Sequence, residues 1–189
     1  MIPSVLCNLA MAVAAVAAVL VHRRKAPLRV VLRYFTALSN LFCALASLVV
    51  VICRLCGGLP LGVSLLKYAG TASVTVTLLT VLLFLGPTLG YRLMLTGPDF
   101  WLHLVCPLLA LTSYSLWDRP AAGPAVVGLA VAPVALYGAV YVYRVLFAPE
   151  ERRWNDFYGF NRGGKWYLSL CAMLIASALI GFALYAIQF

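Results

Sequence analysis

Long apolar runs separated by short polar stretches dominate the pattern of this chain. A bilayer core of roughly 30 Å requires about 20 consecutive apolar residues in a helix. Six runs reach this length and predict helices over residues 3–21, 31–53, 65–86, 98–117, 124–147 and 166–188. The fold class that follows is all-α: a polytopic membrane protein whose six transmembrane helices form a single bundle and a single domain over residues 1–189.

The basic residues gather in alternate loops between these runs. Loops one, three and five are HRRKAPLR (22–29), GYRLMLTGPD (90–99) and APEERRWNDFYGFNRGGK (148–165). Of the 14 Lys and Arg residues, Arg54, Lys67 and Arg119 alone fall on the opposite side. By the positive-inside rule, loops one, three and five are expected in the cytosol and both termini outside.

Composition agrees with the membrane interpretation and indicates which classes of partner are expected. Hydrophobic residues make up 65% of the 189 positions and charged residues 10%, and the mean hydropathy is +1.02, far outside the range of soluble domains. The net charge of +9 is then explained by the basic cytosolic loops, which set the orientation in the membrane and contact anionic lipid headgroups. Nucleic acid is not an expected partner, because the basic residues are divided among membrane loops without a soluble reader fold. The oligomeric state stays open.

Cysteine spacing gives a weak signal for chemistry. Cys53 and Cys56 form CRLC at the outer end of the second predicted helix, a spacing that can form a redox pair or half a metal site. There is no second CxxC and no acidic residue nearby, so an incidental pair is the favoured interpretation. Inside the spans, free cysteine behaves as a small hydrophobe, as expected for Cys7, Cys43, Cys106 and Cys171. No metal and no cofactor are expected.

A polar stripe runs along the second predicted helix. Thr36, Asn40, Cys43 and Ser47 are spaced by four, three and four residues, which places them within a sector of about 60°. Such a stripe is expected to face the interior of the bundle. Small and hydroxylated side chains at these positions can serve helix packing alone, because such residues line membrane helix interfaces.

His103 is the only side chain within the spans, away from their edges, that titrates near neutral pH. Ionisable residues inside a membrane indicate function more often than other residues do. Thr36 and His103 each lie one turn beyond a loop on the same side, roughly 5 to 10 Å below the same headgroup plane. If the second and fourth helices are neighbours, the two side chains can meet. A hydroxyl beside a base is the unit of nucleophilic catalysis.

Further site residues can be nominated around this pair, each with an alternative role. Asp99 precedes His103 by one turn and can orient its imidazole, or can simply complement the helix dipole. Asn40 can donate to an oxyanion, or can form a bond between helices. Three residues at similar depth can bind substrate, although aromatic belts and snorkelling also explain them: Tyr141, Arg144 and Trp166.

Two short motifs carry a resemblance to a known family. RYFTALSNLF (33–42) followed by FWLHLVCPLLAL (100–111), in a six-helix chain of this length, resembles the androgen-induced protein family of membrane hydrolases. The resemblance implies that Thr36 is the nucleophile and His103 its base. It implies cleavage of fatty acid esters of hydroxy fatty acids, lipid substrates with acyl chains, through an acyl-threonine intermediate. Such a reaction requires a neutral imidazole, so its rate should fall as the pH is lowered.

Other functions remain open from the sequence. A related membrane acyltransferase is one, since Cys43 lies two turns below Thr36 on the same stripe. A small transporter or channel is another, with a second stripe of Ser73, Thr77 and Thr80 lining the pathway. The predicted spans disfavour transport, because they contain no corresponding pair of broken helices and no charge at the membrane midplane. A purely structural membrane protein is the third alternative.

Overall fold

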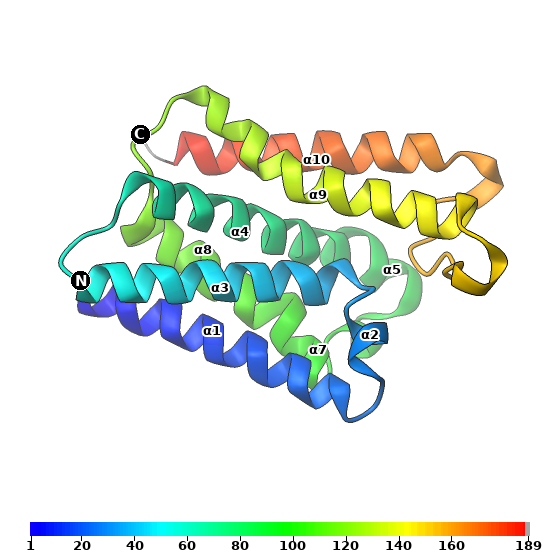
Figure 1. Cartoon of the computed structure of the whole chain (residues 1–189), viewed down its shortest axis with the longest axis horizontal. Coiled ribbons are helices and arrows are strands. Elements are labelled where there is room, and N and C mark those ends of the chain that lie inside the picture. Colours follow the sequence, from blue (N-terminus) through cyan, green and yellow to red (C-terminus); the bar gives the residue numbers. More distant parts are fainter. Residues whose placement is uncertain (188–189) are drawn as a thin grey trace.

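The computed structural model describes residues 1–187 and is a bundle of helices without strands in that range (Figure 1). Six helical stretches are long and apolar enough to cross a membrane: Ile2–Arg23, Phe35–Leu55, Leu61–Leu89, Pro98–Asp118, Pro124–Phe147 and Trp166–Ala186. The predicted all-α polytopic fold is thereby confirmed. The predicted end of the last helix, at 188, lies outside the described residues.

The six stretches are built from shorter elements in sequence order. The α-helices are α1 Ile2–Arg23, α2 Leu28–Val31, α3 Phe35–Leu55, α4 Leu61–Thr80, α5 Gly86–Leu89, α6 Tyr91–Met94, α7 Pro98–Phe100, α8 Cys106–Ser113, α9 Val127–Val142 and α10 Trp166–Ala186. The π-helical turns are η1 Val81–Leu85, η2 Trp101–Val105, η3 Tyr114–Asp118 and η5 Tyr143–Phe147, and the 3₁₀ turns are η4 Pro124–Val126, η6 Glu150–Arg152 and η7 Arg162–Gly164.

Two helix starts differ from the prediction. The second span was expected from residue 31, but α3 begins at Phe35, because Tyr34 is extended (φ −89°, ψ 132°) and separates α3 from the short α2. The third span was expected from residue 65, but α4 begins at Leu61, directly after Pro60. Proline favours this place, since its fixed φ suits a helix start and it has no N–H to satisfy.

Helix α4 is the centre of the bundle. It packs against α3, α8, α9 and α10, while α1 packs against α3 and α8 (Figure 1). At Gly70 the backbones of α4 and α3 approach so closely that a Cβ would lie 3.0 Å from the Cα of Cys43. Small residues permit such contacts between membrane helices. Cys43 is fully buried in this contact, which agrees with a packing role.

The two ends of the bundle differ in what they carry. The N-terminus and the end of α10 lie together at the left in Figure 1, and we call this the terminal end. Helices α2, α5 and α7 lie at the opposite end with the connection of residues 148–165. We call this the loop end. Thr36 and His103 both belong to elements that begin near it.

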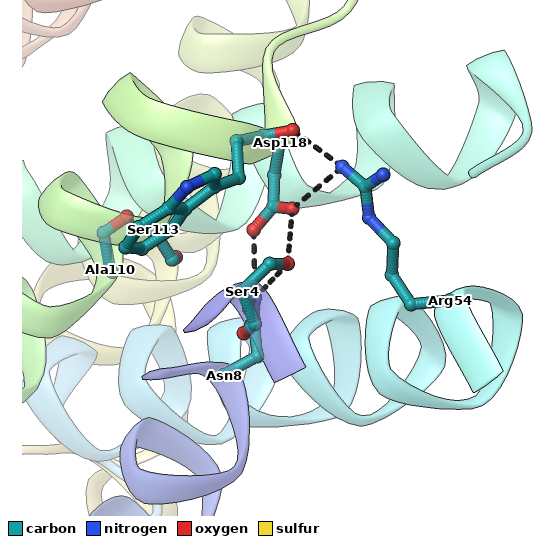
Figure 2. Close-up of polar contacts among 7 residues, drawn as sticks. Ser4, Asn8, Arg54, Ala110, Ser113 and Asp118 are labelled. Atoms are coloured by element: carbon teal, nitrogen blue, oxygen red, sulfur yellow. Dashed lines mark hydrogen bonds and ion pairs between the residues drawn. The ribbon is translucent and has the colours of Figure 1, made fainter. Parts of the chain in front are cut away.

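A buried polar cluster joins three spans at the terminal end (Figure 2). Asp118 is fully buried. Its carboxylate accepts hydrogen bonds from Ser4 Oγ and Asn8 Nδ2, each at 2.7 Å, and pairs with Arg54 Nη2 at 3.3 Å. Arg54 also donates to the carbonyl of Trp117. The cluster therefore locks α1 and α3 to the end of the fourth span.

Replacement of Asp118 should destabilise the bundle. In Asp118→Ala the buried Ser4 and Asn8 lose their acceptor and Arg54 loses its counter-ion, and breaking a buried pair in this way typically costs about 3 kcal/mol. We expect a lower melting temperature of the detergent-solubilised protein, measured by thermal unfolding. Glu151→Ala, which removes an exposed acid, is the matched control. Equal melting temperatures for the two variants would contradict the stabilising role.

Lys67 is deeper than the sequence indicated. The expected helix start at 65 left it at a span edge, whereas it lies in the second turn of α4 and is fully buried. Its ammonium donates to Ser47 Oγ at 2.8 Å. Ser47 thus has a defined partner, and the second-helix stripe faces the bundle interior as predicted, since Asn40, Cys43 and Ser47 are all fully buried.

Candidate active site

Thr36 and His103 meet at the loop end of the bundle. Thr36 is the second residue of α3 and His103 the third residue of η2. The distance between Thr36 Oγ1 and His103 Nε2 is 3.3 Å. The sequence placed the two at equal depth but left open whether their helices are neighbours, and the structure brings the side chains together. In free enzymes such contacts are often looser than in the reacting complex.

The second ring nitrogen of His103 sets the direction of this contact. Nδ1 lies 2.8 Å from the carbonyl oxygen of Met94. A carbonyl can only accept, so the proton of the neutral ring is on Nδ1 and Nε2 is the acceptor. The Thr36 hydroxyl is therefore the donor to Nε2. This is the polarity that a nucleophile and its general base require.

A backbone carbonyl has the role that the sequence gave to Asp99. Asp99 Oδ1 lies 3.1 Å from Nε2 of His22, and both side chains are partly exposed. The imidazole of His103 is instead oriented by Met94, the last residue of α6, whose carbonyl lacks an α-helical partner. The predicted orienting role of Asp99 is thus corrected, because its carboxylate pairs with another histidine.

The side chain of Asn40 links α3 to η2 by hydrogen bonds. Its Nδ2 donates to the carbonyls of Thr36, at 2.8 Å, and Leu102, at 3.0 Å. Leu102 needs this donor because the N–H of Cys106 is bonded to Trp101 instead and Pro107 has no N–H. Both amide hydrogens are used in bonds that link the helices of Thr36 and His103, which is the interhelical role named as the alternative, and the oxyanion role stays a prediction.

Removal of the Asn40 amide should lower stability and activity together. In Asn40→Ala the buried Leu102 carbonyl loses its partner, which costs about 1–3 kcal/mol, and a shift of Thr36 by about 1 Å can cost 10²-fold in rate. Melting temperature and kcat are measured on the same preparation. A fall in kcat with an unchanged melting temperature would support an oxyanion role instead. Asn155→Ala, at an exposed position, is the control.

Tyr158 lies beside Thr36 and was not anticipated from the sequence. Its hydroxyl oxygen accepts the N–H of Phe35, the first residue of α3, at 3.0 Å. Hydrogen-bonding groups of Thr36, both backbone and side chain, also reach this oxygen. Burial raises the pKa of Tyr158 to about 12. The phenol is therefore protonated at neutral pH and can donate a hydrogen bond beside Thr36.

Asp156 holds Tyr158 in place. Its Oδ1 accepts the Tyr141 hydroxyl at 2.9 Å and the N–H of Phe160 at 2.8 Å, and its Oδ2 accepts the N–H of Asn161 at 2.8 Å. The Tyr141 hydroxyl also accepts the N–H of Tyr158 at 3.0 Å. These bonds hold the connection of residues 148–165 against α9, and the bond from the Phe35 N–H to the Tyr158 hydroxyl joins it to the start of α3.

The three residues nominated for substrate binding have other positions. Tyr141 is fully buried beneath the connection and bonded to Asp156. Arg144 lies over the ring of Trp154, 5.7 Å from its centroid, and Trp166 packs edge-on against Phe147. None of the three lines the cavities described next. Their role in substrate binding stays a prediction, because similar depth in the membrane does not by itself place a side chain on the face of Thr36.

Two cavities meet at Thr36. The helix cavity, of about 370 Å³, lies between α3, α4, α9 and α10, and the loop cavity, of about 420 Å³, lies under the connections of the loop end. The helix cavity is lined by Thr77, Val134, Gly138, Leu170, Met173 and Ala176, among others. The loop cavity is lined by His22, Ala26, Val30, Asp99, Leu102 and His103, among others. Thr36, Leu85 and Tyr158 line both.

The cysteines do not offer a competing site in the described part of the chain. Cys43 is fully buried and lines neither the helix cavity nor the loop cavity. Cys53 and Cys56 are free thiols at the terminal end of α3. No group of three or more His, Cys, Asp or Glu among residues 1–187 has a metal-binding arrangement.

The fold and its six apolar helices define the class: an integral, multi-pass, all-α membrane protein. Comparisons of the chain with protein-family models, with curated proteins and with solved structures found no match.

Proposed function

We propose that this protein is an intramembrane lipid ester hydrolase with Thr36 as nucleophile and His103 as general base. The observation that carries the proposal is the Thr36 hydroxyl, which faces the acceptor nitrogen of His103 where two cavities meet. An alcohol is a weak nucleophile until a base takes its proton as it attacks. A hydroxyl that served packing alone would not require an oriented imidazole or open space beside it.

The reaction has two halves. In the first, Thr36 Oγ1 bonds to the ester carbonyl carbon, its proton passes to His103 Nε2, and the carbon–oxygen bond to the alcohol breaks as Nε2 protonates the departing oxygen. In the second, Nε2 takes a proton from water, the hydroxide attacks the acyl-threonine, and the proton returns to Thr36 as the acid leaves. Atoms and charges balance without a metal or cofactor.

Negative charge develops on the carbonyl oxygen in both halves, and two groups are suited to stabilise it. The Tyr158 hydroxyl is a protonated donor beside Thr36. The start of α3 supplies the positive end of a helix dipole. Preorganised donors of this kind are commonly the largest contribution to acyl transfer catalysis.

The substrate class rests on the apolar lining and on the motif resemblance. The resemblance favours a fatty acid ester of a hydroxy fatty acid, and the cavities are lined mainly by hydrocarbon side chains. We propose that the loop end faces the cytosol, in agreement with the basic residues in its connections. The acyl chain then stays in the membrane while water reaches the acyl-threonine from the loop end.

Labelling by a lipid-linked fluorophosphonate tests the proposal. The purified protein in detergent is incubated with the probe and with a fatty acid ester of a hydroxy fatty acid, and the modified peptide is mapped by mass spectrometry. We expect hydrolysis of the ester and a phosphonyl group on Thr36. Hydrolysis without modification of Thr36 would move the nucleophile elsewhere, and the absence of both would contradict the hydrolase.

A further inference from the structure

The two cavities differ in which catalytic side chain they expose. Thr36 lines both, so an ester carbonyl at its hydroxyl has open space on either side. His103 lines the loop cavity and does not line the helix cavity. The base therefore reaches one of the two spaces that flank the nucleophile.

This asymmetry orients the substrate. After the attack by Thr36, His103 must deliver its proton to the alcohol oxygen, so that oxygen must lie on the side of the imidazole. The alcohol part of the ester is then directed into the loop cavity. The acyl chain, on the other side of the carbonyl carbon, is directed into the helix cavity between α3, α4, α9 and α10.

The chemistry of the two linings agrees with this orientation. Among the described residues, none that lines the helix cavity carries a charge, and side chains such as Val134, Leu170 and Met173 suit a saturated chain. The loop cavity contains His22 and Asp99 besides His103. Burial of an ionised group without a partner is strongly unfavourable. Charged substituents are therefore tolerated on the alcohol and excluded from the acyl chain.

We infer that the helix cavity is the acyl-chain site and the loop cavity the alcohol site of an ester with long hydrocarbon on both sides of the carbonyl. The inference rests on the proposed hydrolase function. It also orders the reaction: the alcohol leaves through the loop cavity, water enters the same space beside His103, and the acyl chain remains among the helices until Thr36 is released. Ala176 and Ala26 mark the two sites, since each lines one cavity and not the other.

The same substitution at these alanines tests the assignment. Ala176→Leu fills part of the helix cavity and Ala26→Leu part of the loop cavity. Two series of esters are compared by kcat/KM: one alcohol, hydroxystearate, with acyl groups from acetyl to palmitoyl, and one acyl group, palmitoyl, with alcohols from methanol to hydroxystearate. Ala183→Leu, an exposed position on α10, controls for the added bulk.

We expect Ala176→Leu to lower the palmitoyl-to-acetyl ratio by about tenfold and Ala26→Leu to lower the hydroxystearate-to-methanol ratio by about tenfold. Each variant should keep the parental ratio in the other series. The reverse pattern, or parental ratios in both series for both variants, would overturn the assignment while the parent's hydrolysis left the proposed function intact. A parent that hydrolyses no ester in either series would overturn both.

Discussion

Thr36→Val should lower kcat for ester hydrolysis by about 10⁴-fold, the scale expected when a nucleophile is removed. Valine keeps the branched shape of threonine, so the contacts of α3 with its neighbours are largely retained while the hydroxyl that faces His103 is lost. Thr36→Ser keeps a hydroxyl and should retain measurable activity. A role confined to packing would give the opposite order, since valine preserves more of the threonine volume than serine does.

His103→Ala should reduce kcat on a similar scale, because the Thr36 hydroxyl then has no base to accept its proton. The kcat of the double variant, which combines Thr36→Val with His103→Ala, should be little lower than that of either single variant, since residues that act as a unit give strongly non-additive losses. Each variant is assayed beside Thr96→Ala, an exposed threonine at the loop end, after its elution profile and melting temperature have been compared with the parent. Additive losses, or activity that survives both single changes, would contradict the pair.

Tyr158→Phe should lower kcat by about 10²- to 10³-fold with a smaller effect on KM, the pattern of a lost oxyanion donor. The substitution removes one oxygen atom that both caps α3 at Phe35 and reaches Thr36. A merely structural hydroxyl would affect stability and leave kcat close to the parental value. Tyr143→Phe, which removes an exposed hydroxyl at the loop end, is the matched control.

The pH dependence of hydrolysis gives a second test of Tyr158 as a hydrogen-bond donor. Burial raises its pKa to about 12, so in the folded protein the phenol keeps its proton at pH values where a free tyrosine, with a pKa of about 10, is already ionised. Hydrolysis should therefore not decline between roughly pH 8 and 10 through loss of this proton. A steep alkaline loss that disappears in Tyr158→Phe would contradict the protonated donor.

Depth along the membrane normal could be calculated from the sequence, because the rise per residue of a helix is constant. Thr36 and His103 were placed at the same level in this way, and the polar stripe of α3 was assigned to the interior from its angular period. Direction around the bundle axis could not be calculated in the same way. Tyr141, Arg144 and Trp166 share the level of the site but face other neighbours.

The partners of His103 and Asn40 could not be foreseen from the sequence, for a common reason that lies in the backbone. The partner of His103 is the backbone carbonyl of Met94. Every residue has the same backbone carbonyl, so the amino-acid sequence does not indicate which one will accept this hydrogen bond. The partner of Asn40 is the Leu102 carbonyl, freed by the π-helical turn before Pro107. In that turn the backbone hydrogen bonds span five residues instead of four. Tertiary packing selects this change, and the pattern of hydrophobic residues does not predict it.

The sequence by itself determined the class of this protein, the six spans to within a few residues, the interior face of α3 and the common level of Thr36 and His103. These follow from hydrophobic length and helical period, which are local properties of the chain. The tertiary structure alone decided that the element of His103 lies beside α3, that the connection of residues 148–165 folds back to bring Tyr158 to Thr36, and that two cavities meet there. Such contacts join residues far apart in the chain, and they depend on side-chain packing among several helices at once, which local propensity does not specify.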